Sequence, residues 1–125
     1  MKTLRETVQE AARDTHLFSV RECDKYAAAL LKKLRSLQIH GAIVRLSAPV
    51  GRGFIVPKNP ALLLPFNVSL EMAIATNGRH WGILVDGHVY EQLLRDGVPL
   101  DQWPGYYDCD VHHFNVEVVA NFDAE

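Results

Sequence analysis

The 125-residue chain is poor in the features that mark specialised protein classes. It has two cysteines, Cys23 and Cys109, which form neither a CxxC pair nor the cysteine–histidine cluster typical of structural zinc. No apolar run approaches the roughly 20 residues of a membrane-spanning helix. Basic residues do not outnumber acidic ones, and the formal net charge is −2, so we expect neither a membrane nor nucleic acid as a partner.

The N-terminal stretch MKTLRETVQEAARD also lacks the apolar centre of a signal peptide. We therefore expect a cytoplasmic protein as encoded, with both thiols reduced. The sequence does not distinguish such a protein from the last part of a larger secreted one. A chain that is 48% hydrophobic and 22% charged has an ordinary globular composition, and its length predicts a single domain over residues 1–125.

Two helices are expected in the first third of the chain. The letters TLRE form a capping box at the start of a helix over residues 4–14. The letters SVRE repeat this pattern at residues 19–22. Apolar residues then follow at spacings of three and four from Cys23 to Leu34, which is typical of an amphipathic helix. Gly41 is the expected C-terminal cap of this second helix.

Strands are expected after the second helix. Residues 42–47 are apolar and β-branched, and the Asp-Gly pair at 86–87 separates alternating segments at 80–85 and 88–94. This arrangement predicts a β-hairpin. Alternation over residues 114–120 predicts the last strand. Helices followed by antiparallel strands give an α+β fold, with the N-terminal helices packed on the sheet.

The segments between these elements are less regular. Residues 48–67 hold four of the six prolines and predict an irregular stretch with a short strand near residues 54–56. Residues 68–76 fit either a helix or a strand. Residues 95–111 are rich in Gly, Pro and Asp, which predicts a loop.

Cys23 is the candidate nucleophile. With Ser19 as the N-cap, Cys23 lies in or just after the first helical turn, where free backbone N–H groups and the helix dipole favour a thiolate. Cys23 also lies on the apolar side of its helix, so its side chain is expected to point toward the body of the protein. A thiolate at a helix start, facing a histidine on a strand, is the arrangement of an activated cysteine nucleophile.

His80 and Glu91 are the candidate base and acid. With a two-residue turn, Gly82 pairs with Glu91, and His80 lies diagonally from Glu91 on the same face of the hairpin. Gly82 leaves space between them, so Glu91 can accept a hydrogen bond from one ring nitrogen while the other nitrogen faces Cys23. This is the cysteine–histidine–acid form of a catalytic triad. A register slip of one residue would exchange Glu91 for Gln92.

Each of these residues also has an ordinary structural interpretation. A lone cysteine at an apolar helix position is commonly a small core residue. His80 can be a boundary residue at the start of a strand, and Glu91 a solvated strand residue. The residues alone therefore leave an enzyme and a non-enzyme interpretation open.

Three motifs occur in a fixed order along the chain. Cys23 opens a helix that ends in LRSLQIHGAIVRLS, and NGRHWGILVDGHVYE and DGVPLDQW follow. This order, over residues 18–103, resembles the papain fold toxin 2 domains of bacterial polymorphic toxin systems. The resemblance implies a minimal papain-like fold with Cys23 as nucleophile and His80 as base. Glu91 falls where the family often carries Asp, and Gln92 is the fallback for the third residue.

The resemblance implies a cysteine-dependent enzyme for acyl transfer at a protein amide, with a Cys-His-Glu triad and no cofactor. Attack on a glutamine side chain would be deamidation, attack on a main-chain amide would be peptidase action, and transfer to a lysine amine would be transglutamination. The implied partners are a protein substrate and a cognate immunity protein, and the domain would be delivered into target cells as a toxin. A papain-like binding or adaptor module without activity is the alternative.

Further residues around the site are also expected to contribute. The backbone N–H of Cys23 and a side chain such as Ser19, or a residue of the 48–67 loop, would form the oxyanion hole. Trp81 and Trp103 are candidates for binding substrate. No metal site is expected in the segment 108–113, because the spacing of its candidate ligands matches no standard site. These candidates are Asp108, Cys109, Asp110, His112 and His113.

Overall fold

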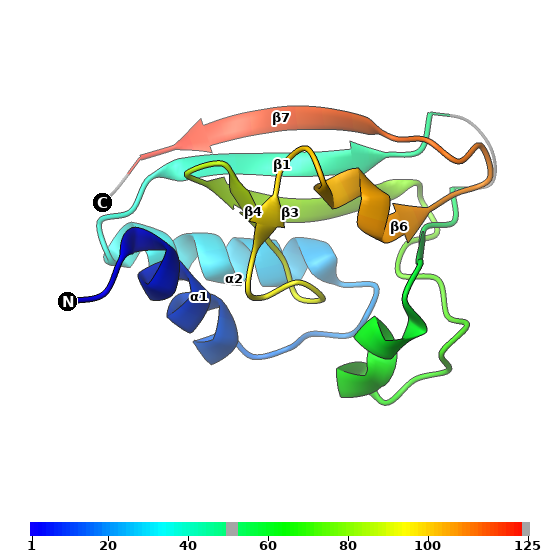
Figure 1. Ribbon diagram of the computed structural model, residues 1–125, viewed down its shortest axis with the longest axis horizontal. Helices are drawn as coiled ribbons and strands as arrows, with labels where there is room; N and C mark the ends of the chain where they lie inside the picture. Colours follow the sequence, from blue (N-terminus) through cyan, green and yellow to red (C-terminus); the bar gives the residue numbers. More distant parts are fainter. Residues whose placement is uncertain (50–52, 124–125) are drawn as a thin grey trace.

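Two helices lie against one face of an antiparallel sheet (Figure 1). The computed structural model describes residues 1–49 and 53–123. This arrangement confirms the expected α+β fold. The helices are α1 (Leu4–Asp14) and α2 (Cys23–Ser36), with the 3₁₀ helices η1 (Pro60–Phe66) and η2 (Trp103–Tyr106). The strands are β1 (Gly41–Ser47), β2 (Val56–Pro57), β3 (Arg79–Val85), β4 (His88–Tyr90), β5 (Val98–Pro99), β6 (Tyr107–Asp108) and β7 (Asn115–Phe122).

The main sheet has the strand order β5-β4-β3-β1-β7, and its neighbouring strands are antiparallel. A second sheet pairs β2 with β6. β3 lies inside the main sheet, between β1 and β4, and it pairs with β4 only over residues 83–85. His80 lies in the part of β3 that pairs with β1, opposite Leu46, and this pairing fixes the position of its backbone.

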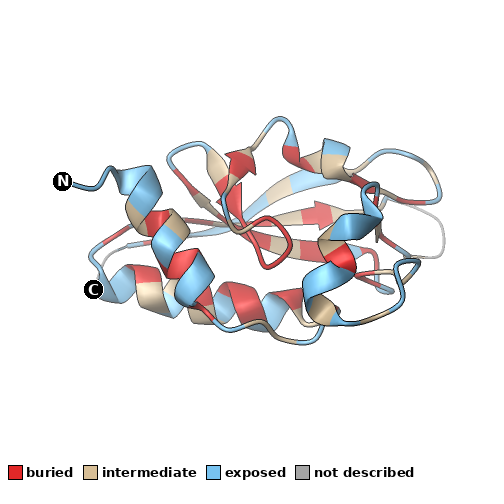
Figure 2. Ribbon diagram, turned by 60° about the horizontal axis from the view of Figure 1, so that its bottom comes forward, coloured by how far each residue is buried: buried red, intermediate tan, exposed pale blue. Residues whose placement is uncertain are grey.

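The helices form where local capping and apolar spacing agree. At the start of α1, the Thr3 side chain accepts a hydrogen bond from the Glu6 N–H, and the Glu6 carboxylate accepts one from the Thr3 N–H, as the capping box predicts. Buried segments alternate with exposed ones along both helices (Figure 2). Between the helices, the Tyr26 hydroxyl donates to the Ala12 carbonyl at 2.6 Å.

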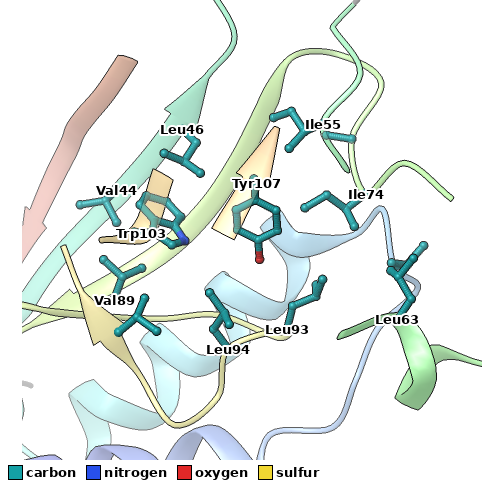
Figure 3. Close-up of a cluster of buried hydrophobic side chains, with 13 residues drawn as sticks. Val44, Leu46, Ile55, Leu63, Ile74, Val89, Leu93, Leu94, Trp103 and Tyr107 are labelled. Carbon is teal, nitrogen blue, oxygen red and sulfur yellow. The ribbon is translucent and has the colours of Figure 1, made fainter. Parts of the chain in front are cut away.

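The main sheet carries a hydrophobic cluster on each face. On one face, α1 and α2 pack on residues that include Ile83 of β3. On the other, Val44 and Leu46 of β1 join side chains from the loops and short helices (Figure 3). Because side chains alternate along a strand, His80 shares the parity of Leu84, which packs on this second cluster.

The hairpin is shorter than the sequence predicts. It pairs residues 83–85 with residues 88–90 in the expected register, but β4 ends at Tyr90 and not at residue 94. The chain turns there, and the Leu94 N–H donates to the Glu91 carbonyl at 3.1 Å. The Glu91 carboxylate accepts a hydrogen bond from the Leu93 N–H, with 3.3 Å between Oε1 and the nitrogen. The longer strand does not form because this donor is then not available to a strand ladder.

Both ends of α2 differ from the prediction. Ser19 is not the N-cap, because it closes a separate turn with Glu22, and Glu22 occupies the cap position without a side-chain hydrogen bond to the helix. Cys23 is therefore the first helical residue. At the other end, Gln38 adopts the left-handed backbone with a φ of 64°. Gly41, the expected cap, instead begins β1.

The irregular segments contain more short elements than the sequence predicts. β2 lies beside the expected short strand, and residues 68–76 form neither a helix nor a strand apart from one bridge, between Ile55 and Ala75. η1 was not expected; it starts where the Asn59 side chain accepts the Ala61 N–H at 3.1 Å. The expected loop over residues 95–111 contains β5, η2 and β6. None of the described helices is long and apolar enough to cross a membrane.

Candidate active site

His80 and Glu91 form a buried contact beside the second cluster. Nε2 of His80 lies 2.6 Å from Oε2 of Glu91. The exposed fractions of the two residues are 0% and 1%. His80 is the second residue of β3, and Glu91 directly follows β4. The hairpin thus brings together the two residues that the sequence proposes as base and acid, although its ladder stops one residue before Glu91.

Three further donors hold the Glu91 carboxylate. The Trp103 indole N–H donates to Oε2 at 2.7 Å, and the Tyr107 hydroxyl donates to Oε1 at 2.6 Å. The backbone N–H of Leu93 donates to Oε1 at 3.3 Å. A buried carboxylate needs such donors, because burial removes the water that would otherwise solvate it. The two oxygens therefore have fixed partners, and the carboxylate is held in one orientation toward His80.

Trp103 and Tyr107 come from η2 and β6 and belong to the second cluster (Figure 3). The Tyr107 ring also contacts His80, with 4.9 Å between ring centroids. Burial raises the pKa of Tyr107 well above its ordinary value, and the Glu91 charge raises it further. Its hydroxyl consequently stays protonated and remains a donor. The contact of Tyr107 with Glu91 was not predicted from the sequence, because an aromatic residue in a loop carries no signal of a distant buried carboxylate.

Gly82 makes room for the Trp103 ring. A β-carbon at residue 82 would lie 2.6 Å from Cγ1 of Val89 and 3.2 Å from Cζ2 of Trp103. The space that the sequence predicts near Gly82 is thus filled by the indole, which reaches Glu91 from there. Trp103, a candidate for binding substrate, is fully buried and is absent from the walls of the pocket at Cys23. Its contact is with the acid.

Cys23 lies beside His80 at the start of α2 and is 4% exposed. Burial by itself lowers the pKa of His80, but the charge of Glu91, the hydrogen bond to Glu91 and the nearby Cys23 thiol raise it, to about 10. Nε2 is occupied by Glu91, so Nδ1 is the nitrogen left for the thiol. Nδ1 has no partner within hydrogen-bond geometry among the described residues. The sulfur is therefore near the ring but loosely aligned, as is common before substrate binds.

The backbone N–H of Cys23 is available for a ligand. Among the described residues, none accepts a hydrogen bond from it, whereas the next turn begins with the N–H groups of Lys25 and Tyr26 donating to the Glu22 carbonyl. Ser19, the other candidate for the oxyanion hole, is exposed, and its own N–H donates to the Glu22 carboxylate at 3.2 Å. Of the two candidates, the backbone N–H of Cys23 is the donor that belongs to the same residue as the nucleophilic sulfur.

Gln92, the fallback for the third residue, contacts the segment before Cys23 instead of His80. Its side-chain oxygen accepts the Phe18 N–H at 3.3 Å. Its nitrogen donates to the carbonyls of Ser19, at 3.0 Å, and Val20, at 3.5 Å. Neighbouring residues of one turn thus hold the two halves of the site: Glu91 orients His80, and Gln92 ties down the chain that leads into Cys23.

Cys23 opens onto a small pocket of about 240 Å³. Trp81, the other candidate for binding substrate, forms part of its wall, and the Arg45 guanidinium lies 5.1 Å from the centre of the Trp81 ring. A second pocket, of about 210 Å³ and largely apolar, shares Asp24 and Trp81 with the first. The remaining walls of the Cys23 pocket come from Arg21, Ala75, Thr76, Asn77 and Arg79.

The segment 108–113 makes ordinary local contacts. Oδ1 of Asp108 lies 2.9 Å from Nδ1 of His112 and accepts the Cys109 N–H at the same distance. Sγ of Cys109 contacts the His113 carbonyl at 3.2 Å. Within residues 1–49 and 53–123 no three potential ligands gather in a metal-binding arrangement. Both thiols are free.

Comparison with known proteins identifies a family. The family model described as "Papain fold toxin 2" matches residues 6–106 of the chain. No curated protein and no solved structure gives a significant match. The matched range contains Cys23, His80, Glu91 and Trp103, and it ends one residue before Tyr107.

Proposed function

The chain belongs to the papain fold toxin 2 family, and on that basis we propose that it is a cysteine-dependent enzyme that transfers the acyl group of a protein amide. Cys23 is the nucleophile, His80 is the acid and base, and Glu91 orients His80. The observation that carries this proposal is the 2.6 Å contact between Nε2 of His80 and Oε2 of Glu91, with Cys23 near enough to His80 to raise its pKa.

The first half of the reaction forms a thioester. The Cys23 thiolate attacks the amide carbon, and the carbonyl oxygen takes up negative charge. The backbone N–H of Cys23 donates to that oxygen. His80, with a pKa near 10, is protonated at neutral pH, so it can give its Nδ1 proton to the leaving nitrogen as the carbon–nitrogen bond breaks.

The second half returns the enzyme to its starting state. Neutral His80 takes a proton from water, the resulting hydroxide attacks the thioester carbon, and the carbon–sulfur bond breaks to release the acid and the Cys23 thiolate. Throughout, Glu91 holds Nε2–H and stabilises the imidazolium. Trp103 and Tyr107 support this role because their hydrogen bonds leave the carboxylate little freedom to rotate.

We propose a protein substrate, attacked either at a glutamine side chain or at a main-chain amide. A transglutaminase would need a lysine amine to replace water at the thioester. The small size of the Cys23 pocket, about 240 Å³, favours an extended side chain over a bulky one. A cognate immunity protein would cover this pocket and keep substrate away from Cys23.

The second candidate is an inactive papain-like binding module. It is favoured by the burial of the site, since Cys23 is 4% exposed and His80 is 0% exposed. Under this alternative, the thiol is a packing residue and His80 with Glu91 is a structural ion pair. The enzyme proposal requires instead that substrate reaches Cys23 through the pocket that this residue lines.

Expression in a bacterial cytosol separates the two candidates. The wild-type domain should slow growth, and Cys23→Ala should abolish the effect while the protein still folds. Cys109→Ala is the matched control, because it removes the other buried thiol and should remain toxic. Harm that persists in Cys23→Ala, with the protein present at the same level, would contradict the enzyme proposal. Mass spectrometry of host proteins then distinguishes deamidation from cleavage.

A further inference from the structure

Two arginines lie close in the sequence to the candidate nucleophile and base. Arg21 lies in the turn two residues before Cys23, and Arg79 directly precedes His80 on β3. Both side chains are exposed, and both line the pocket that contains Cys23. Neither arginine has a role that the sequence alone predicts, because each is an isolated basic residue in its own segment.

The guanidinium groups of Arg21 and Arg79 are available to bind a ligand. Nε of Arg21 donates to the Ala73 carbonyl at 3.1 Å, which anchors the side chain. Among the described residues, neither Arg21 nor Arg79 forms an ion pair. A guanidinium that is fixed at one nitrogen can still bind a carboxylate through the other two.

Acidic residues near the pocket reduce this charge without cancelling it. Asp24 belongs to the same wall. The hydrogen bonds from Arg45 and Ser47 lower the pKa of the Glu117 carboxyl, and the charge of Arg79 lowers it further. Apart from Cys23 itself, the two arginines and the one aspartate give the wall a formal charge of +1. The whole chain, by contrast, has a net charge of −2.

We propose that this pocket binds an acidic side chain of the substrate, next to the amide that Cys23 attacks. The substrate class is therefore an acidic segment of a protein. This inference rests on the proposed function, because it assigns a specificity to the same site. The two arginines are specificity residues in this account, and they take no part in bond making.

The test compares two alkylating reagents of nearly equal size. Iodoacetate carries a carboxylate and iodoacetamide is neutral, and each forms a thioether with Cys23 and releases iodide. The thiolate fraction and the reactivity of the sulfur enter both rates equally. The ratio of the iodoacetate rate to the iodoacetamide rate therefore reports the electrostatic environment of the pocket.

The variants are Arg21→Gln, Arg79→Gln and the double variant, each in a Cys109→Ala background so that one thiol reacts. Lys32→Gln is the matched control, since it removes the same charge from an exposed position on α2 that lies outside the pocket. We expect the rate ratio to fall by about fivefold in the double variant and to stay unchanged in the control, and the fall should shrink at high salt.

The outcomes separate this inference from the proposed function. A reactive Cys23 whose ratio is the same in wild type and double variant would overturn the acidic-substrate pocket and leave the enzyme proposal standing. A ratio that falls equally in Lys32→Gln would also overturn it, because the effect would then be one of total charge. A Cys23 that reacts with neither reagent would overturn the proposed function and this inference together.

Discussion

The indole N–H of Trp103 donates to the same Glu91 oxygen that contacts His80, at 2.7 Å and 2.6 Å respectively. Two donors thus converge on Oε2 from η2 and β3, and the Tyr107 hydroxyl and a backbone N–H hold the other oxygen. The candidate site is therefore supported from within the protein by a shell of aromatic donors. The same shell explains why a charged pair can be buried this completely.

Replacing Glu91 by Gln should lower the pKa of His80. The carboxylate is the group whose charge most strongly raises that pKa toward 10, while burial acts in the opposite direction. Titration of the His80 ring by NMR measures the change. Activity should fall by about a hundredfold or more, because the imidazolium loses its stabilising charge. Glu71→Gln removes an exposed carboxylate and serves as the control. An unchanged His80 titration would contradict the assignment of Glu91.

Replacing Tyr107 by Phe should destabilise the fold by about 1.5–3 kcal/mol, the usual range for a hydrogen bond to a charged group. The variant leaves Oε1 of Glu91 with the Leu93 N–H as its remaining donor. Urea unfolding measures the loss. Tyr106→Phe is the matched control. Tyr106 is the half-buried neighbour of Tyr107, and within the described part of the chain it makes no such contact with Glu91. Equal unfolding midpoints for the two variants would show that the Tyr107 bond adds nothing.

The buried pair should also make stability depend on pH in one direction. The pKa of His80 is raised in the folded protein from 6.5 to about 10. Its contribution is therefore fully present below about pH 6.5 and is lost as the pH rises through 10. Unfolding free energies of wild type and His80→Gln over this range test the sign. The difference between them should shrink with rising pH, and a difference that grows would contradict the protonated form of His80.

Replacing Gln92 by Leu should slow the reaction of Cys23 without changing the pKa of His80. The amide holds residues 18–20 through three hydrogen bonds, so its loss loosens the chain leading into the nucleophile. A stability loss of about 1–3 kcal/mol is expected, because buried backbone groups lose their partners. Gln102→Leu, at an exposed position, is the control. A shifted His80 titration in Gln92→Leu would mean that Gln92 acts on the ring after all.

Much of the fold follows from local sequence signals. The capping box of α1, the apolar spacing of α2 and the Asp-Gly turn each determine structure within a few residues, and each prediction agrees with the structure. The ends of elements were harder to predict, because distant groups decide them. β4 stops at Tyr90 because Glu91, the next residue, turns into the core. Nothing in the neighbouring sequence indicates that the Glu91 carboxylate has hydrogen-bond partners in η2 and β6.

The candidate site was predictable in its centre and not in its surroundings. His80 and Glu91 could be paired because the hairpin register follows from a two-residue turn. The donors to Glu91 and the arginines at the pocket come from segments far apart in the chain, and only the tertiary packing brings them together. Trp103 illustrates the difference. From the sequence, an aromatic residue in a loop is as consistent with a substrate groove as with a buried hydrogen-bond donor, and the structure shows the second.

The most direct test of the account is the rate at which iodoacetamide alkylates Cys23 as a function of pH, in Cys109→Ala and in the same protein with His80→Ala. A thiolate held by the imidazolium predicts that Cys23 reacts at about pH 6 nearly as fast as at about pH 8, and that the variant without His80 reacts slowly until the pH approaches the ordinary thiol range near 8.5. A Cys23 that is inert in both proteins, or that follows the same ordinary thiol profile in both, would contradict an activated nucleophile.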